Sequence, residues 1–263
     1  MDKIFVLTDI HFGIDKKSIT HPEYFRQNNS QALKEINNLL KYIPSNINLY
    51  LQLGDLIRSI ENQEVDQKHL IKTKNILKLY FPKIYNITGN HDQALQNQSL
   101  DQSIINLNLK NCQALIIDPQ NKQQLSIDEI NKVKSLISKS KKKTILIFTH
   151  IPIFPISSKD NFYFYNKISD QYFKNYQEIF NNLNYKSKIF VISGHYHWIS
   201  STEINSKIRQ ITLPSFSENI ITTPKCDIHP CVYNLIEINK KFLSIKSYSR
   251  QFCFSSLEFS ISH

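Results

Sequence analysis

Five short clusters of histidine, aspartate and asparagine each follow directly after an apolar run of the sequence. Each preceding run is rich in β-branched and aliphatic residues and has the length of a strand. The side chains concerned are Asp9, His11, Asp55, Asn90, His91, His150, His195 and His197. Ligand-binding groups in α/β proteins collect beyond the carboxyl ends of strands. We therefore expect these residues to meet at one edge of a sheet.

The candidate donors form a mixed nitrogen and oxygen set of four histidines, two aspartates and one asparagine, namely Asp9, His11, Asp55, Asn90, His150, His195 and His197. Such a set suits Mn, Fe or Zn better than Mg or Ca. Seven donors exceed the needs of one ion, so with one bridging carboxylate they predict two. Side chains two residues apart on an extended chain point the same way. This parity predicts that Asp9 and His11 share an ion, and His195-Tyr196-His197 repeats the spacing.

Helical patterns alternate with these strands. Amphipathic spacing predicts helices over 29–42, 66–80 and 170–183, and a Ser cap with an acidic first turn predicts one over 126–138. Further strands are expected over 114–117, 208–213, 232–238 and 242–248, so the chain becomes β-rich from about residue 202. The order predicts a layered α/β sandwich formed by a single domain over 1–263. Only four glycines occur, and Gly54, Gly89 and Gly194 each immediately precede a candidate donor.

The motifs Asp-x-His, Gly-Asp, Gly-Asn-His-Asp, a strand-end His and Gly-His-x-His stand in the order of the calcineurin-like metallophosphoesterase superfamily, which the chain resembles over roughly 4–214. The resemblance implies a four-layer α/β/β/α sandwich of two mixed sheets flanked by helices. It implies Asp9, His11 and His197 on one metal, Asn90, His150 and His195 on the other, and Asp55 bridging. Glycines at 54, 89 and 194 fit places where the backbone turns tightly beside the ions.

The implied chemistry is hydrolysis of a phosphoester. Two cations lower the pKa of a bridging water, and the resulting hydroxide attacks phosphorus in line. His91 is the expected general acid, since it neighbours Asn90 and would point to the leaving-group side. Asn90 and His91 are also expected to contact substrate.

Position 58 departs from the family pattern. Many relatives carry an aspartate three residues after the bridging aspartate, where it orients the acid histidine, and this chain has Arg58. Either Asp92 or a backbone carbonyl orients His91, or the enzyme depends less on acid catalysis. Arg58 itself either contacts a phosphate oxygen or faces solvent at a helix start.

The substrate class stays open between several phosphoesters. The compact length, His150-Ile151-Pro152 and Leu213-Pro214-Ser215-Phe216 are similar to the cyclic-nucleotide phosphodiesterase-like bacterial branch, which implies phosphodiesters such as cyclic nucleotides. Asp9-Ile10-His11-Phe12-Gly13 resembles the opening of recombination exonucleases, but little chain follows Leu213 to form their DNA-capping domain. A phosphomonoesterase or a protein phosphatase is a further alternative. The Gly-Asp-x-x-Asp-Arg-Gly signature of the Ser/Thr protein phosphatases is absent from the sequence, which argues against that group. The lipid-A precursor hydrolases of the same superfamily are disfavoured, because they usually have Arg at the position of His91.

A non-catalytic scaffold is the alternative from a different class, because some superfamily members, including a retromer subunit, keep the fold as a binding platform after losing metal ligands. Retention of every ligand together with His91 argues against that reading. The aromatic stretch 154–165 is either a surface loop or a wall beside the substrate.

The composition of the whole chain indicates which classes of binding partner are expected. A formal net charge of +10 favours anionic partners, although heavy use of Lys, Asn and Ile can also reflect compositional bias. A small phosphoester or nucleotide is the expected substrate, and nucleic acid is possible but not favoured. No signal peptide or membrane span is expected, and four scattered cysteines suit a reducing compartment, so a cytoplasmic location is predicted. Oligomeric state is not readable. His21, His69, His229 and His263 have no assigned role, and the Cys226-His229-Cys231 arrangement lacks a clear fourth ligand.

Overall fold

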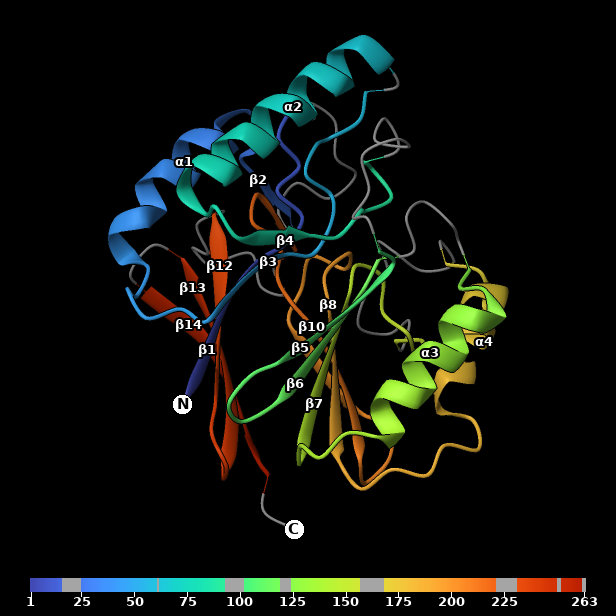
Figure 1. Cartoon of the computed structure of the whole chain (residues 1–263). Coiled ribbons are helices and arrows are strands. Elements are labelled where there is room, and N and C mark those ends of the chain that lie inside the picture. The colour runs from blue at the N-terminus through green and yellow to red at the C-terminus, as the bar shows by residue number, and fades with distance from the viewer. Residues whose placement is uncertain are drawn as a thin grey trace.

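A computed structural model of the chain describes residues 1–15, 25–60, 62–92, 102–118, 124–156, 168–220, 231–249 and 252–261. Most of the aromatic stretch 154–165 lies outside these ranges, as do His21, Cys226, His229 and His263. The described parts form two six-stranded sheets that pack face to face, with helices on both outer sides (Figure 1).

The first sheet has the strand order β14(Phe252–Ser260), β13(Phe242–Ser249), β12(Val232–Ile238), β1(Asp2–Leu7), β3(Leu49–Gln52), β4(Ile84–Asn86). Strand β1 pairs in parallel with β3 and antiparallel with β12, and β3 pairs in parallel with β4. The sheet is therefore mixed, as predicted, and the carboxyl ends of β1, β3 and β4 meet at one edge.

The second sheet has the order β5(Ile104–Asn108), β6(Gln113–Ile117), β7(Thr144–Thr149), β8(Lys188–Ser193), β10(Ile208–Thr212), β9(Ser200–Glu203). Strands β6, β7, β8 and β10 are parallel, and β5 and β9 are antiparallel edges. A separate two-stranded sheet joins β2(Phe25–Gln27) to β11(Glu218–Ile220).

Helices α1(Ala32–Leu39) and α2(Gln63–Tyr80) cover the first sheet, and α3(Ile127–Ser138) and α4(Asp170–Gln177) cover the second (Figure 1). Short 3₁₀ turns over Asn29–Gln31 and Leu40–Tyr42 complete the helix expected at 29–42. A third, over Glu178–Phe180, extends α4 to residue 180, so the predicted end at 183 is three residues too late. The predicted cap of α3 is confirmed, since Ser126 and Glu129 form a reciprocal capping box.

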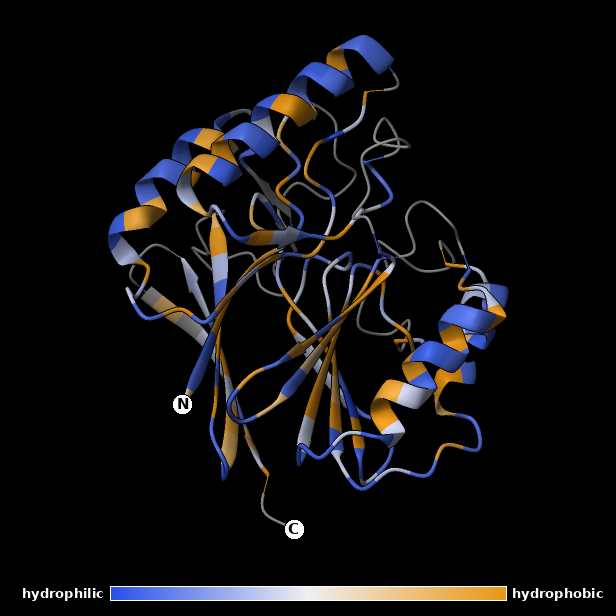
Figure 2. Ribbon diagram, viewed as in Figure 1, coloured by the Kyte–Doolittle hydropathy of each residue, from blue (hydrophilic) through white to orange (hydrophobic). Residues whose placement is uncertain are grey.

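Successive side chains along each central strand point to opposite faces of its sheet, and this alternation produces the four layers. In β1, Ile4 and Val6 enter the core between the sheets, whereas Phe5 and Leu7 pack under α1 and α2. In β7, Leu146 and Phe148 face the central core, and the alternate residues Ile145 and Ile147 pack under α3 and α4. Both faces are thus apolar, which explains why these runs are continuous rather than alternating. Figure 2 shows the apolar strands inside and hydrophilic outer faces on the helices. The four-layer α/β/β/α prediction is confirmed.

Several strands escaped sequence prediction. Strands β5, β9 and β14 are sheet edges, and β2 and β11 form the small separate sheet. An edge strand buries less of its surface, so its apolar pattern is weak; the sequence of β9, Ser-Ser-Thr-Glu, has none. No helix in the described part of the chain is both long and apolar enough to span a bilayer.

Candidate metal centre

Five of the seven candidate donors stand in left-handed backbone. The φ angles are 53° at Asp9, 46° at His11, 56° at Asp55, 68° at His195 and 54° at His197. Such angles are uncommon outside glycine and cluster at functional sites, where the surrounding structure holds the strain. The prediction that Asp9 and His11 lie on an extended chain is therefore wrong. They come together because the chain after β1 turns sharply twice, while Ile10 between them stays fully buried.

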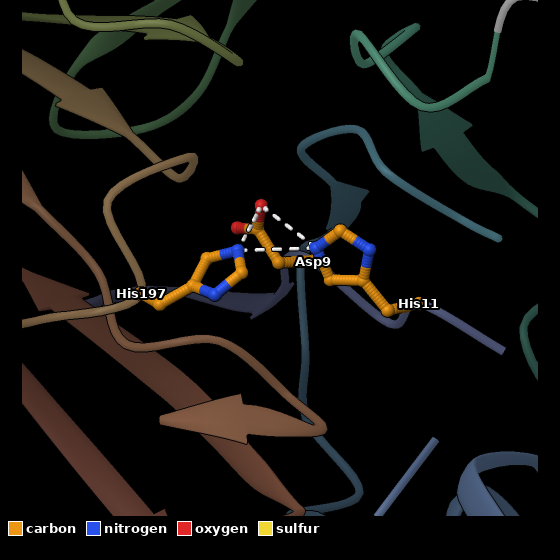
Figure 3. Close-up of side chains that lie close together, drawn as sticks. All are labelled: Asp9, His11 and His197. Carbon is orange, nitrogen blue, oxygen red and sulfur yellow. Dashed lines mark hydrogen bonds and ion pairs between the residues drawn. The ribbon is translucent and has the colours of Figure 1, made fainter. Parts of the chain in front are cut away.

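Asp9, His11 and His197 form one donor group (Figure 3). The Nε2 atoms of His11 and His197 lie 3.0 Å apart. The Oδ1 atom of Asp9 lies 3.3 Å from Nε2 of His197 and 3.8 Å from Nε2 of His11. All three side chains are buried. Two imidazole nitrogens facing each other beside a carboxylate fit a shared cation.

Asp55, His150 and His195 form a second donor group. The Oδ2 atom of Asp55 lies 3.4 Å from Nε2 of His150 and 3.6 Å from Nε2 of His11. One carboxylate oxygen therefore faces a histidine of each group, which is the position a bridging ligand needs. Asn90 completes the second group, since its Oδ1 atom lies 2.9 Å from Nε2 of His150.

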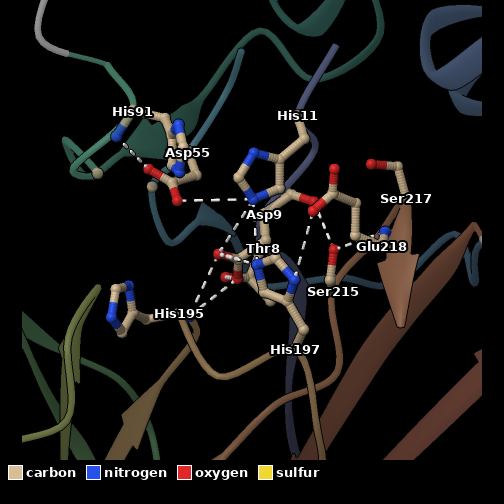
Figure 4. Close-up of polar contacts among 12 residues, drawn as sticks. Thr8, Asp9, His11, Asp55, His91, His195, His197, Ser215, Ser217 and Glu218 are labelled. Atoms are coloured by element: carbon tan, nitrogen blue, oxygen red, sulfur yellow. Dashed lines mark hydrogen bonds and ion pairs between the residues drawn. The ribbon is translucent and has the colours of Figure 1, made fainter. Parts of the chain in front are cut away.

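Neighbouring groups hold the carboxylate of Asp9 from behind. Thr8 donates its hydroxyl to Oδ2 of Asp9 over 2.5 Å, and the backbone N–H of His195 reaches both carboxylate oxygens at 3.0 and 3.2 Å (Figure 4). These contacts tie the end of β1 in the first sheet to the end of β8 in the second. The site therefore spans the seam between the two sheets.

Two glycines are required by close approach at this seam. Gly54 has a φ of +99°, and a Cβ there would lie 2.5 Å from Nδ1 of His150. A Cβ on Gly89 would lie 2.1 Å from the backbone nitrogen of Asp55. Since real Cβ atoms do not approach other atoms so closely, only glycine fits at either position.

The charges of the site suit metal ligation. Burial lowers the pKa of His11 well below its usual range and that of His195 to about 3, so both rings carry a lone pair at neutral pH. Burial alone would raise the pKa of Asp9, but His197 and His150 together lower it to about 2. In the same way, His150 and His91 hold the pKa of Asp55 well below its usual range. His150 differs: burial opposes its charge, yet Asp55 raises its pKa to about 9.

His91 lies beside Asp55 and His11. Its backbone N–H donates to Oδ1 of Asp55 over 2.7 Å, and its ring meets that of His11 edge-on with centroids 5.0 Å apart. Burial lowers its pKa, Asp55 raises it, and Arg58 and two histidines lower it further, for a net decrease. A ring nitrogen of His91 also lies within 4.8 Å of donor atoms of His11 and Asp55.

Asp92 holds two loops together through their backbones. Its carboxylate accepts N–H groups from Leu56 at 2.8 Å and Ile57 at 3.3 Å through Oδ1, and from Gly89 at 2.9 Å through Oδ2. Both oxygens are therefore occupied with backbone that carries Asp55 and Asn90. This arrangement favours a loop-clamping role for Asp92 over the orientation of His91.

Arg58 is buried, so the expectation that it could face solvent is wrong. Its guanidinium forms an ion pair with Oε1 of Glu218, while Oε2 of Glu218 lies 3.6 Å from Nδ1 of His197. Sequence reasoning missed Glu218. It lies in β11, away from the strand-end clusters, and no local pattern marks it.

Glu218 is itself anchored at several points. Asn29 donates its side-chain amide to Oε1, and the backbone N–H of Glu218 donates to Oγ of Ser215 over 2.9 Å. The hydroxyl of Ser215 donates to the carbonyl oxygen of Asp9 over 2.7 Å (Figure 4). Ser217 donates to Oδ1 of Asn29 over 2.7 Å. The carboxylate thus has one fixed position behind His197.

The arrangement as a whole fits metal ions. Imidazole nitrogens and carboxylate oxygens converge in two groups, and Asp55 stands between them. Without a cation, four histidines and two carboxylates would be buried within a few ångströms of one another at a large desolvation cost.

Comparisons with known proteins agree with this geometry. A dimetal phosphatase from Danio rerio shares 14% identity and a TM-score of 0.71, with 99% of each chain covered. Purple acid phosphatase PPD1 from yellow lupin (Lupinus luteus) shares 9% identity and a TM-score of 0.66, covering 98% of this chain and 53% of that one. This chain thus spans about half of the lupin protein. At such identities the likeness shows the fold alone.

Sequence comparison supplies the family. A search against curated proteins gave no significant match. The family model for calcineurin-like phosphoesterases matches residues 2–225, which include every candidate donor. The chain therefore belongs to the calcineurin-like phosphoesterase family, and its converging donor groups support a dinuclear metal site.

Proposed function

We propose that the protein hydrolyses phosphodiesters with two metal ions, which family membership and the site support at the coarser level of a metal-dependent phosphoester hydrolase. The observation that carries the proposal is the position of Asp55, whose Oδ2 atom faces histidines of both donor groups within 3.6 Å. A carboxylate in this position can hold two cations a few ångströms apart, as in-line phosphoester hydrolysis needs.

Each donor has a proposed place. Asp9, His11 and His197 hold one ion, Asn90, His150 and His195 the other, and Asp55 both. Bound at these donors, divalent or trivalent Mn, Fe or Zn would lower the pKa of a water and neutralise charge on the phosphate. The surrounding structure must hold the strained backbone at five donors, which supports a ligand geometry that is fixed in advance.

His91 is the proposed general acid. Its ring stands beside His11 and Asp55, and its lowered pKa leaves it neutral at rest. Arrival of an anionic phosphate would favour the protonated ring, so a ring nitrogen can then give its proton to the leaving oxygen. Arg58 and Asn90 are proposed to contact the phosphate, with Arg58 held in place by Glu218.

A phosphomonoesterase is the second candidate, because the similar solved structures are described as a dimetal phosphatase and a purple acid phosphatase. The diester proposal depends on the similarity of the sequence to the cyclic-nucleotide phosphodiesterase-like branch. The single domain and the cytoplasmic location both remain predictions.

A hydrolysis panel with Mn present tests the proposal. It contains bis-p-nitrophenyl phosphate, p-nitrophenyl phosphate, cyclic AMP and single-stranded DNA, each with wild type, His91→Ala and a control, His69→Ala. His69 lies on α2, where its ring contacts that of Phe12, and it is not among the candidate donors. We expect diesters to react faster than monoesters, and His91→Ala alone to lose about 10²- to 10⁴-fold in kcat.

Three results would contradict parts of the proposal. A preference for p-nitrophenyl phosphate would replace the diesterase with a phosphomonoesterase. Preferred cleavage of DNA would favour an exonuclease. Failure of the purified protein to bind metal under Mn-replete conditions would favour a scaffold.

A further inference from the structure

The net positive charge of the chain is gathered in five loops that contain no acidic residue. The loops are 109–112, 139–143, 181–188, 204–207 and 239–241, and their ten lysines are Lys110, Lys139, Lys141, Lys142, Lys143, Lys186, Lys188, Lys207, Lys240 and Lys241. We call this surface the lysine face. The chain has 32 Lys and Arg against 22 Asp and Glu, so these ten lysines equal its entire formal excess of +10.

Hydrogen bonds join the loops of the lysine face into one surface. Lys142 Nζ donates to the carbonyl of Lys110 over 2.9 Å, and Lys188 N–H donates to the carbonyl of Lys143 over 2.8 Å. The N–H of Ile189 donates to the carbonyl of Lys207 over 2.8 Å. Four of the loops are therefore adjacent along the second sheet.

The fifth loop joins through the carboxyl end of β14. Lys188 Nζ donates to the carbonyl of Ser260 over 3.1 Å, and Ile261 N–H donates to the carbonyl of Lys241 over 2.7 Å. All five loops lie in the lower half of Figure 1, where β7 and β8 begin.

In the part of the chain that the structure describes, no ion pair joins an acidic side chain to the nine lysines of the face other than Lys188. The ammonium groups of Lys142, Lys188 and Lys207 donate to backbone carbonyls, which carry no formal charge. Asp2, which accepts from Asn111, is buried, and Glu237 lies near Lys3 and Lys246 instead. Eight of the ten lysines are exposed, and Lys142 and Lys188 are half-buried.

The lysine face is separate from the candidate metal centre. It lies at the amino ends of β7 and β8, whereas His150 and His195 follow their carboxyl ends. Each strand has six residues, so about 20 Å separates the two surfaces along the strands. This exceeds the Debye length of about 8 Å at physiological salt. The charge of the lysine face therefore contributes little to the binding of a phosphoester at the candidate metal centre.

We infer that the lysine face binds an anionic lipid bilayer and holds the candidate metal centre on the side away from it. Clusters of four to eight lysines are sufficient to attract a protein to anionic lipid headgroups. Phe242 follows Lys241 directly and is 40% exposed, so an apolar ring stands where it can enter the headgroup layer.

Nucleic acid fits the lysine face less well. All ten cations are lysines, and arginine, which provides bidentate contacts to phosphates and bases, is absent from the five loops. Tyr185, an aromatic ring in these loops, lies under the ammonium of Lys207 with 5.3 Å to its centroid rather than open for a base to stack.

Vesicle co-sedimentation of the full chain tests this inference. One vesicle contains phosphatidylcholine alone and the other about 30% phosphatidylserine, in about 0.1 M salt. We expect binding to the phosphatidylserine vesicles only, and its loss in about 0.5 M salt, since the attraction is electrostatic.

A charge variant and a matched control give the sharpest comparison. Lys141, Lys143, Lys240 and Lys241 change to Gln in the first; Lys34, Lys68, Lys78 and Lys132, also exposed, change to Gln in the second. Each lysine near the bilayer is worth about fivefold in partitioning. The face variant should therefore lose at least about tenfold, and the control, with the same net charge, should lose much less. Phe242→Ser should weaken binding while leaving its salt dependence unchanged.

Several outcomes would overturn the inference. These are equal loss in both four-lysine variants, no binding to phosphatidylserine vesicles, or tighter binding of a fluorescent single-stranded RNA or DNA than of vesicles. The last would assign the face to nucleic acid. Metal binding and hydrolysis should match wild type in the face variant, so this test is independent of the proposed function. Thermal melting checks folding, and the pairs Lys141/Lys143 and Lys240/Lys241 can be changed separately.

Discussion

Glu218 links two residues of the candidate site that lie far apart in the sequence: its carboxylate pairs with the guanidinium of Arg58 and stands 3.6 Å from Nδ1 of His197. A carboxylate behind a ligating histidine draws the Nδ1 proton and directs Nε2 toward the metal. The same carboxylate offsets the buried charge of Arg58, which would be costly alone. Glu218 therefore supports at once His197, a proposed metal ligand, and Arg58, a proposed phosphate contact.

Glu218→Gln should weaken Mn binding by about 10- to 100-fold, because the amide orients His197 less strongly and carries no charge. Isothermal titration of purified protein with Mn measures the affinity directly. Glu178→Gln, at an exposed position on the far helix layer, is the matched control and should bind as wild type. Unchanged affinity in Glu218→Gln would show that His197 needs no support from behind.

Asp92→Ala should destabilise the fold, since three buried backbone N–H groups lose their acceptor. Unsatisfied buried groups cost about 1–3 kcal/mol each, so a loss of about 3 kcal/mol is expected even if water replaces part of the contact. Thermal or urea unfolding measures the change. Asp170→Ala removes an exposed carboxylate from the first turn of α4 and should cost well under 1 kcal/mol. Equal losses in both variants would contradict the clamping role.

Gly89→Ala should abolish metal binding, because its Cβ would come within 2.2 Å of Oδ1 of Asp55 and displace the bridging carboxylate. Gly13→Ala is a graded control, since its Cβ would meet Arg58 at 3.2 Å, a contact that small shifts can relieve. The number of Mn ions bound per chain after dialysis against Mn measures the effect of both substitutions. Retention of two ions in Gly89→Ala would mean that the two loops can separate without loss of the site.

Metal binding should release a proton at neutral pH. Burial opposes the charge of His150, but Asp55 raises its pKa to about 9, so the ring is protonated at pH 7 and must lose that proton to ligate. The affinity for Mn should therefore rise by up to about tenfold per pH unit below pH 9 and level off above it. Titrations in buffers of different ionisation enthalpy count the released protons. A flat affinity between about pH 6.5 and 8.5 would contradict a charged His150.

The sequence alone determined the parts of the protein that local pattern controls. Continuous apolar runs marked the central strands, since strands buried on both faces must be apolar throughout. The ends of those runs placed Asp55, Asn90 and His150 at the carboxyl ends of strands, where ligands collect. The expectation that all donors meet at one edge of a single sheet was wrong, because β3 and β4 belong to the first sheet and β7 to the second. The four-layer arrangement followed from family resemblance, and alternation within β1 and β7 accounts for it physically.

Only the tertiary structure decided the features that depend on pairing between distant segments. Glu218 reaches His197 because β11 pairs with β2, and no local periodicity encodes that pairing. The left-handed backbone at Asp9 and His11 is held by hydrogen bonds to the carbonyl groups of Gly54 and Asp55. The sequence correctly predicted that the Asp9 and His11 side chains lie together, but the extended chain from which this was argued is not present. The ten lysines of the lysine face lie in five loops between residues 110 and 241. They form one face because these loops start or close neighbouring strands at the same end of the sandwich.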